Sequence, residues 1–348
     1  MWNFRKDPRI ITTLFMPAIP AFRQAGDSMN KCLWSRRKFL RMAGGAAGIL
    51  AGGGAGWLRG GGLSVPEASA AQEIGPKVSA AHGSDPGGNV RRAVAALGGM
   101  RSFVSRGDVV VLKPNIGWDR TPEQAANTNP DVVVALAEMC LSAGAKEVRV
   151  FDRPCNEPRR CYANSGIQAA LEAFGKRHGA SGSVRIYHVE DRKFRRTSIP
   201  GALAMKEWDL HRDALEADRI VNIPVAKHHS LSTVTLGLKN MMGVMGGNRG
   251  QIHFNLSECL VDLNRRLPSS LTVIDATRVL VRNGPTGGNL ADVRAPGIIF
   301  ASADVVAADV VAAEKVFGLK ARDVAHIQKA LDGRLGVASP AQIRVVEV

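Results

Sequence analysis

The chain has 348 residues and a formal net charge of +15 at pH 7, with only 5% aromatic residues. Residues 1–70 contain ten Lys or Arg and three Asp or Glu, a net charge of +7, which leaves +15 − 7 = +8 for the remainder. This mildly basic remainder has no Lys/Arg blocks interleaved with aromatic residues. It therefore argues against nucleic-acid binding and favours a site for an anionic small molecule.

A paired arginine near the N-terminus, Arg36-Arg37, lies in the basic stretch 31–41. The Gly/Ala-rich apolar run 43–58 and the small-residue sequence Ala68-Ser69-Ala70 follow it. This order is typical of a twin-arginine export signal in residues 1–70. Because spanning a bilayer takes about 20 apolar residues, a retained anchor is the less favoured alternative. We expect export by the twin-arginine translocase, cleavage of the signal, and a periplasmic or otherwise extracytoplasmic location.

The remainder is predicted to be a linker, residues 71–90, followed by a single α/β domain, residues 91–348, in which strands and helices alternate. The predicted helices cover residues 91–104, 130–143, 166–178, 232–242, 255–266, 304–317 and 321–331. The predicted strands cover residues 109–112, 147–151, 184–189, 219–224, 271–275, 296–301 and 342–346. This order predicts a mostly parallel sheet with helices on both faces, in three layers.

Polar residues follow four of the predicted strands, where open parallel sheets bind their ligands. They are Lys113-Pro114-Asn115, Asp152-Arg153, Lys227-His228-His229 and Asp275, with Asn283-Gly284 shortly after the last. Lys239-Asn240 and His253 lie nearby in the sequence. We therefore expect one shared site at this edge of the sheet.

Within that site, lysines suit a carboxylate or phosphate, and histidine and aspartate suit proton transfer. The predicted catalytic residues are His229, Asp275 and Lys227. The predicted ligand-binding residues are Lys113, Asn115, Lys239, Asn240, Asn283 and Gly284. Since neighbouring residues of an extended chain point to opposite sides, only one of His228 and His229 is expected to face the site, and we favour His229.

A metal ion is an alternative cofactor, and its identity stays open. The candidate ligands are His229, His253, Asp275 and Asp309. A ferredoxin-type iron–sulfur cluster is not expected, because the cysteines that follow Cys32 form no Cys-x-x-Cys motif. Cys155 and Cys161 either pair in an oxidising compartment or remain free thiols.

Three segments together resemble the family catalogued as domain of unknown function 362: residues 110–115, 220–229 and 235–243. Asp262-Leu263-Asn264, Asp275, Asn283-Gly284-Pro285 and Asp309 continue the pattern. Some members of that family carry iron–sulfur ferredoxin segments, and this chain departs from them in lacking the cysteine pattern. The resemblance implies a shared site but no particular reaction.

Three functions are compatible with these observations. The favoured one is an exported protein with a basic, anion-binding and catalytic site, although the sequence does not establish that the chain is an enzyme. The alternatives are a periplasmic binding or accessory protein without turnover, and a metalloprotein of redox maturation. The oligomeric state is not indicated.

Overall fold

The computed structural model describes residues 75–348, which lie within one compact unit, residues 70–348. The predicted export signal in residues 1–70 lies outside the described residues. Among the helices between residues 75 and 348, none combines the length and the apolar character that crossing a membrane requires.

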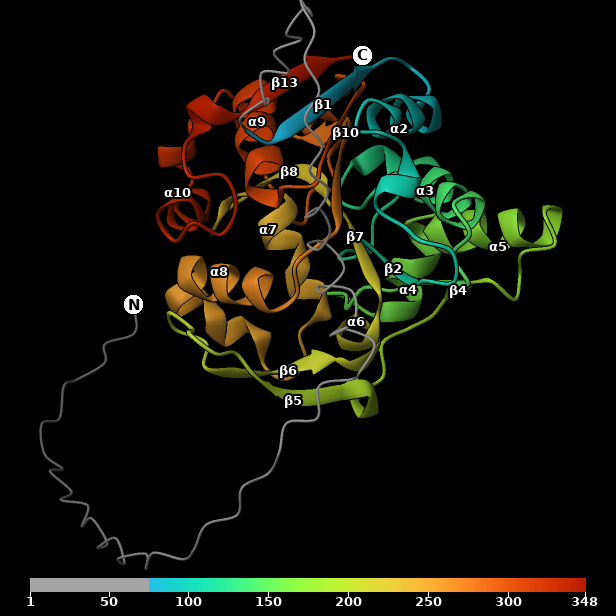
Figure 1. Ribbon diagram of the computed structural model, residues 1–348, viewed down its shortest axis with the longest axis horizontal. Coiled ribbons are helices and arrows are strands. Elements are labelled where there is room, and N and C mark those ends of the chain that lie inside the picture. Colours follow the sequence, from blue (N-terminus) through green and yellow to red (C-terminus); the bar gives the residue numbers. More distant parts are fainter. Residues whose placement is uncertain (1–74) are drawn as a thin grey trace, which may run out of the picture. The chain divides into compact units, whose positions relative to one another are not determined.

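A mixed sheet forms the centre of this unit (Figure 1). Its main path is β13 (Arg344–Glu347), β1 (Lys77–His82), β12 (Ile298–Ser302), β10 (Leu271–Leu280), β7 (Arg219–Ile223), β2 (Val109–Pro114), β3 (Glu147–Val150) and β4 (Val184–Ile186). The five strands from β10 to β4 are parallel to one another, and β13 is parallel to β1. Only β12 is antiparallel to both of its neighbours in this path. The predicted mostly parallel sheet is confirmed.

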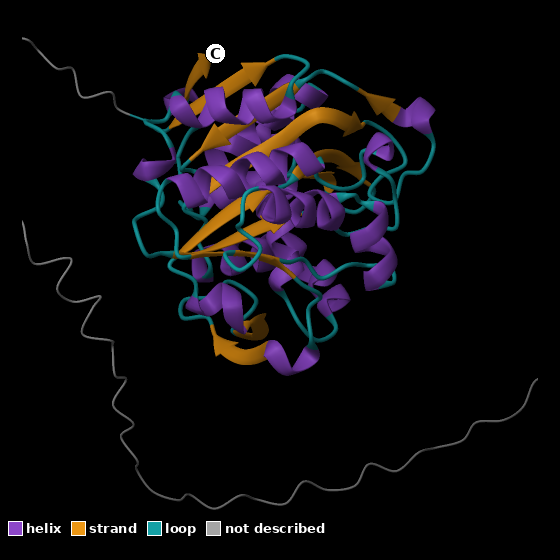
Figure 2. Cartoon of the chain, turned by 90° about the vertical axis from the view of Figure 1, so that its right-hand side faces the viewer, coloured by secondary structure: helices purple, strands orange, loops and turns teal. Residues whose placement is uncertain are grey.

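Helices cover both faces of the sheet, which confirms the predicted three layers (Figure 1). One face carries α2 (Pro86–Ala95), α3 (Pro130–Ser142) and α5 (Ile167–Arg177), with α4 (Pro158–Asn164) beside α5. The other carries α7 (Gly237–Asn240), α8 (Leu256–Arg266), α9 (Val305–Phe317) and α10 (Ala325–Asp332). Figure 2 shows the molecule from the side of α2, α3 and α5.

The alternation of side chains along β2 explains this layering. Val110 and Leu112 pack into the apolar cluster of α2, α3 and α5, whereas Val111 packs into the cluster on the opposite face. Helix α3 begins where its capping residue predicts. Asn129 Oδ1 accepts a hydrogen bond from the backbone N–H of Asp131 at the start of α3, 3.0 Å away.

Four smaller strand pairings lie outside the main path. After β7 the chain continues as β8 (Val225–His229), which pairs with β10 and, in a hairpin, with β9 (Thr233–Thr235). Strand β11 (Val293–Arg294) pairs with β10, while β5 (Phe194–Ser198) and β6 (Glu207–His211) form a separate hairpin before α6 (Arg212–Glu216). Short 3₁₀ helices occupy Met100–Ser102, Pro122–Gln124, Asp191–Lys193, Met241–Val244, Arg249–Asn255, Leu290–Asp292, Ala321–Asp323 and Pro340–Gln342.

Two segments differ from the sequence prediction. Residues 77–82, within the predicted linker 71–90, form β1 between β12 and β13, and α2 already begins at Pro86. The small residues Val78, Ser79, Ala80 and Ala81 are fully or almost fully buried there, and the Gly, Pro and Ser residues around them hid this short strand from the sequence prediction. Residues 232–242, predicted as one helix, instead form β9 and the short helix α7. The β-branched sequence Thr233-Val234-Thr235 favours a strand over a helix.

Candidate functional site

Several of the predicted polar residues converge on one cavity of about 360 Å³. We call it the basic cleft. Eight of the residues that the sequence placed at this edge of the sheet line it: Asn115, Asp152, Arg153, Lys227, His229, Lys239, Asn240 and His253. Trp118, Cys155 and Arg249, which the sequence did not place at the site, line it as well.

Strand β8 places Lys227 and His229 on the cleft side. His228, between them, is not part of the lining, as the alternation of a strand requires. Its Nδ1 instead accepts a hydrogen bond from the backbone N–H of Gly284, 3.1 Å away. The hairpin with β9, in which Lys227 lies opposite Thr235, fixes this register.

Lys239, on α7, is only 8% exposed and lines the cleft. Its side-chain Nζ makes no hydrogen bond and no ion pair with any residue of the described range 75–348. Burial lowers the pKa of Lys239 to about 8, so its ammonium group is charged at neutral pH. Because a buried cation is unfavourable unless it is paired, an anionic group bound in the cleft would stabilise Lys239.

Lys227 is 1% exposed and makes no ion pair with any described carboxylate. Its Nζ donates hydrogen bonds to Asn115 Oδ1, 3.1 Å away, and to the carbonyl oxygen of Ala126. Burial is the main cause that lowers the pKa of Lys227 to about 7, and the positive charges of Lys239 and Lys113 add to it. At neutral pH this amine therefore exists in both protonation states.

A chain of asparagines holds the floor of the cleft in place. Asn115 Nδ2 donates to Asn240 Oδ1 over 3.0 Å, and Asn240 Nδ2 donates to Asn222 Oδ1 over 2.9 Å. Asn222 Nδ2 in turn donates to the carbonyl oxygen of Gly237, over 2.8 Å. The orientation of Lys227 is thus tied to β2, β7 and α7, because Asn115 accepts its hydrogen bond at the end of this chain.

His229 is held as a neutral ring with a defined tautomer. Its Nδ1 accepts hydrogen bonds from the backbone N–H groups of Leu231 and Ser232, at 3.1 and 3.3 Å. An accepting Nδ1 carries no proton, so the proton of the neutral ring is on Nε2. Burial, followed by the charges of Lys239 and Lys227, lowers the pKa of His229 to about 3. His229 is therefore a hydrogen-bond donor at neutral pH and not a titrating base.

Lys113 lies beneath the cleft and does not line it. Its Nζ is 2.9 Å from Asp152 Oδ1, and both side chains are almost fully buried. Asp152 Oδ2 accepts a hydrogen bond from the backbone N–H of Ile116, 2.6 Å away. Asp152 is the one acidic residue of the described lining, so its pairing with Lys113 leaves the charges of Lys239 and Arg249 without a carboxylate counterpart.

Arg249 and Cys155 form one side of the cleft. Arg249 Nη2 donates to the carbonyl oxygen of Pro154 over 2.8 Å and lies 3.2 Å from Cys155 Sγ. Arg249 Nη1 donates to the carbonyl oxygen of Arg153. These contacts tie the glycine-rich loop 246–250 to the segment that follows β3.

Asp275, predicted to be catalytic, does not line the cleft. Its Oδ2 accepts from the backbone N–H of Asn129, 2.7 Å away, and its Oδ1 accepts from both the backbone N–H and the hydroxyl of Thr277. With both carboxylate oxygens occupied in this way, Asp275 positions the start of α3 and has no oxygen directed to a ligand.

Asn283 and Gly284 also lie outside the lining, although Pro285 and Thr286 belong to it. Asn283 Nδ2 donates to Asp292 Oδ2 over 2.7 Å. At Gly284 a Cβ atom would be 1.9 Å from the carbonyl oxygen of His228, so only glycine allows this loop to approach β8. Both residues support the wall of the cleft and do not contact its interior.

The four metal-ligand candidates do not come together. Asp309 is fully buried on α9, where its carboxylate accepts from the backbone N–H groups of Gly237 and Leu238, at 2.6 and 2.9 Å. Burial raises the pKa of Asp309 to about 7. His253 lines the cleft with His229, but its Nδ1 is 2.8 Å from the carbonyl oxygen of Gly250. Between residues 75 and 348 no group of three or more His, Cys, Asp or Glu is arranged to hold a metal ion.

The cysteines of the described range are all free thiols: Cys140, Cys155, Cys161 and Cys259. Cys155 is exposed and Cys161 is buried, and the two are not bonded to each other. From the sequence, Cys155 was expected to pair with Cys161 or to remain a free thiol, and it was not placed at the site. The rule that identified Lys113 and Lys227 also applied to it, because Cys155 follows the end of β3 by five residues.

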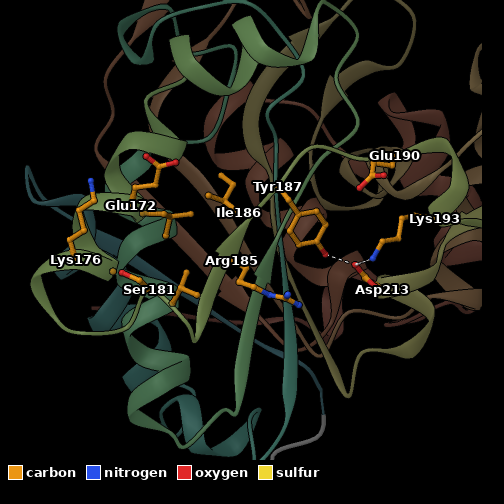
Figure 3. Close-up of a pocket in the computed structure, with 12 residues that line it drawn as sticks. Glu172, Lys176, Ser181, Arg185, Ile186, Tyr187, Glu190, Lys193 and Asp213 are labelled. Carbon is orange, nitrogen blue, oxygen red and sulfur yellow. Dashed lines mark hydrogen bonds and ion pairs between the residues drawn. The ribbon is translucent and has the colours of Figure 1, made fainter.

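A second cavity, of about 500 Å³, lies between α5, β4 and the segment that precedes β5 (Figure 3). Tyr187 and Lys193 both point toward Asp213 there: the Tyr187 hydroxyl donates to Asp213 Oδ2 over 2.6 Å, and Lys193 Nζ is 3.6 Å from the same oxygen. Arg185 forms an ion pair with Glu147. Although this cavity is larger, these charges are already neutralised within the protein, whereas the lysines of the basic cleft are not.

Comparison with known proteins identifies a family. The family model described as "Domain of unknown function (DUF362)" matches residues 110–314, a range that contains the whole lining of the basic cleft. A thylakoid-associated protein of Synechocystis sp., sll1697, is 29% identical over 231 residues, which cover 64% of this chain and 67% of that protein.

Among solved structures, the lactate racemase apoprotein from Thermoanaerobacterium thermosaccharolyticum matches with a TM-score of 0.39 and 10% sequence identity. The match covers 65% of this chain and 54% of the racemase chain, so the chain spans about half the length of that protein.

Proposed function

We propose that the chain, which belongs to the DUF362 family, is an exported protein that binds a small organic anion in the basic cleft and exchanges protons with it. One observation carries this proposal: Lys239 is buried and charged at neutral pH, and no described residue neutralises it. Burying an unpaired cation is unfavourable unless a ligand supplies the opposite charge. The ligand that this cleft suits is therefore an anion.

The size and the donors of the cleft limit the class of anion. A cavity of about 360 Å³ lies at the small end of ligand pockets, which suits a compact carboxylate or phosphate. Lys239 supplies the charge, and His229 supplies a neutral N–H donor from Nε2. Asn115 and Asn240 are held by their own hydrogen bonds and orient the groups around them.

Lys227 is the residue suited to proton transfer. A general acid or base is most effective when its pKa lies near the working pH, and burial gives Lys227 a pKa of about 7. His229 has a pKa of about 3 and stays neutral in that range, so it donates a hydrogen bond and does not titrate. This assignment keeps Lys227 and His229 in the site. Lys227 takes the proton-transfer role that was also predicted for Asp275.

Binding is tested by isothermal titration calorimetry of the purified chain with inorganic phosphate, malonate and pyruvate. At least one of these anions is expected to bind, and Lys239→Met should weaken that binding about tenfold or more, the usual effect of losing one charged hydrogen bond. Lys176→Met is the matched control, because Lys176 is an exposed lysine of the second cavity. The proposal fails if no probe binds, or if the two variants bind equally well.

Proton exchange is tested by proton NMR of malonate and pyruvate in D₂O. The protein should accelerate replacement of the carbon-bound hydrogens next to the carboxylate or carbonyl, and Lys227→Met should abolish the acceleration. Binding without any exchange would instead support the alternative of a binding or accessory protein without turnover.

Export is tested by replacing Arg36 and Arg37 with lysine and fractionating the cells. The natural chain should be found outside the cytoplasm with a new N-terminus near Ala70. The double variant should remain in the cytoplasm with its N-terminus intact. Equal distribution of both proteins would contradict the proposed route and partner, the twin-arginine translocase.

A further inference from the structure

We propose that Lys227 forms a Schiff base with the carbonyl carbon of a small 2-oxo acid, whose carboxylate is held by Lys239 in the basic cleft. This inference rests on the anion-binding function proposed above and adds to it a substrate class and a covalent step. Proton transfer alone requires only a base, whereas imine formation requires a primary amine, accessible from the cleft, beside a carboxylate site.

The hydrogen bonds of Lys227 match those of a neutral amine. A neutral amine has two N–H groups and one lone pair, while an ammonium group has three N–H groups and no lone pair. Lys227 Nζ has two acceptors, Asn115 Oδ1 and the carbonyl oxygen of Ala126, and no described carboxylate forms an ion pair with it. Both N–H groups of the neutral amine therefore donate a hydrogen bond, and the lone pair of this nitrogen has no hydrogen-bond partner among the described residues.

The neighbourhood of Lys227 favours that neutral state. Full burial has the largest effect and disfavours the charged form. Cys155 and Asp152 oppose it, whereas Lys239 and Lys113 add positive charge nearby. Desolvation and an adjacent cation are the two ways in which proteins activate a lysine as a nucleophile. Asp152, the acidic residue of the described lining, is paired with Lys113, 2.9 Å away, and forms no ion pair with Lys227.

The cleft supplies the other two groups that a 2-oxo acid requires. Lys239 lines the same cavity and has no described partner, so it is available for the carboxylate. His229 lines the same cavity, and its ring proton is on Nε2, since Nδ1 accepts two backbone hydrogen bonds. A hydrogen bond from that group to the carbonyl oxygen assists its departure.

The step balances without an oxidant or reductant. The lone pair of Lys227 Nζ forms a bond to the carbonyl carbon, and the carbonyl oxygen takes up one proton as the nitrogen loses one. The resulting carbinolamine then loses its hydroxyl group together with the second proton of the nitrogen, as one molecule of water. A carbon–nitrogen double bond remains, and hydrolysis reverses the step.

The test is reductive trapping on the purified full-length chain. Pyruvate and sodium cyanoborohydride are added, and the adduct is located by intact mass and peptide mapping. We expect one reduced pyruvate adduct on the peptide that contains Lys227. Malonate, which has carboxylates but no ketone carbonyl, should suppress trapping by competition. Lys239→Met should lower the adduct yield about tenfold or more, because it removes the charge that holds the carboxylate.

Peptide mapping of the natural chain locates the adduct without reference to any variant, so the test stands even if Lys227→Arg fails to fold. Lys176→Arg, on the surface, should leave the adduct unchanged. Adducts spread over surface lysines, or a yield that Lys227→Arg does not reduce, would overturn the inference. If pyruvate binds by calorimetry but is not trapped, the Schiff base is wrong and anion binding stands. If neither pyruvate nor malonate binds, both are wrong.

Discussion

Lys113 Nζ lies 2.9 Å from Asp152 Oδ1 beneath the basic cleft, and each side chain is almost completely removed from solvent. The pair joins β2 to the segment after β3, at the point where the backbone N–H of Ile116 also donates to Asp152. It thus determines which positive charges remain for a ligand. Lys113 was predicted to bind the anion directly, but its charge is used within the protein.

Asp152→Asn should strongly destabilise the fold. The substitution leaves Lys113 buried without a counter-charge, and breaking one partner of a buried ion pair costs about 3–5 kcal/mol. Urea unfolding monitored by circular dichroism measures the loss. Glu207→Gln, which removes an exposed ion pair with Arg196, is the matched control and should cost about 0–1 kcal/mol. Equal losses of unfolding free energy in the two variants would show that the buried ion pair stabilises the fold no more than the exposed one does.

Gly243→Ala should disrupt the same pair from the other side. A Cβ atom at Gly243 would lie 1.7 Å from Asp152 Oδ1 and 2.7 Å from Lys113 Nζ, so the ion pair must move to accommodate it. We expect a loss of about 1–3 kcal/mol in unfolding free energy, as in other overpacked sites. Gly182→Ala meets no atom within 4 Å and serves as the control. An unchanged unfolding midpoint for Gly243→Ala would contradict this packing.

Sequence patterns predicted the layers of the fold because the strands and helices have clear apolar periods. The hairpin of β8 and β9 was missed for a physical reason. Its residues Lys227 and His229 are buried but polar, so they interrupt the apolar run that identifies a buried strand. Asn222 in β7 interrupts its strand in the same way, and it proves to be a link in the asparagine chain.

For the site, the rule of strand carboxyl ends identified Asn115 and Lys227 but could not separate cleft residues from supporting ones. Asp275 follows that rule as well as Lys227 does, yet its oxygens are occupied by Asn129 and Thr277. Which polar group is already satisfied depends on partners distant in the sequence, as with Asp309 and Gly237, and no local pattern carries that information.

The pH dependence of stability should report on Lys227. Its pKa is about 7 in the folded chain and near the usual lysine value when unfolded, so the unfolded state binds more protons between these limits. Stability therefore rises with pH in that range, by about 2 kcal/mol between pH 7 and 9. In Lys227→Met this contribution is absent. Urea unfolding at pH 6, 7, 8 and 9 tests it, and parallel profiles for the two proteins would rule it out.

Anion binding should weaken as the pH rises through about 8, since Lys239 loses its proton there. A bound anion favours the charged form and moves the decline to higher pH. Lys239→Arg is the informative variant, because arginine stays protonated across the whole range. Calorimetry with malonate between pH 6 and 10 should show a decline for the natural chain and a smaller one for Lys239→Arg. The same decline in both would assign the titration to another group.

Cys155 gives a direct probe of occupancy of the cleft. It is the exposed thiol among the four cysteines of residues 75–348, and it lines the basic cleft beside Arg249. Iodoacetamide should therefore label Cys155 in the folded chain well before Cys140, Cys161 and Cys259, which are buried.

An anion in the cleft should slow this labelling of Cys155, by about tenfold when its concentration is ten times the dissociation constant. Mass spectrometry of digested samples, taken with and without malonate, follows the reaction at each cysteine. Labelling of Cys155 at the same rate in both samples, at a malonate concentration that calorimetry shows to be saturating, would place the bound anion elsewhere.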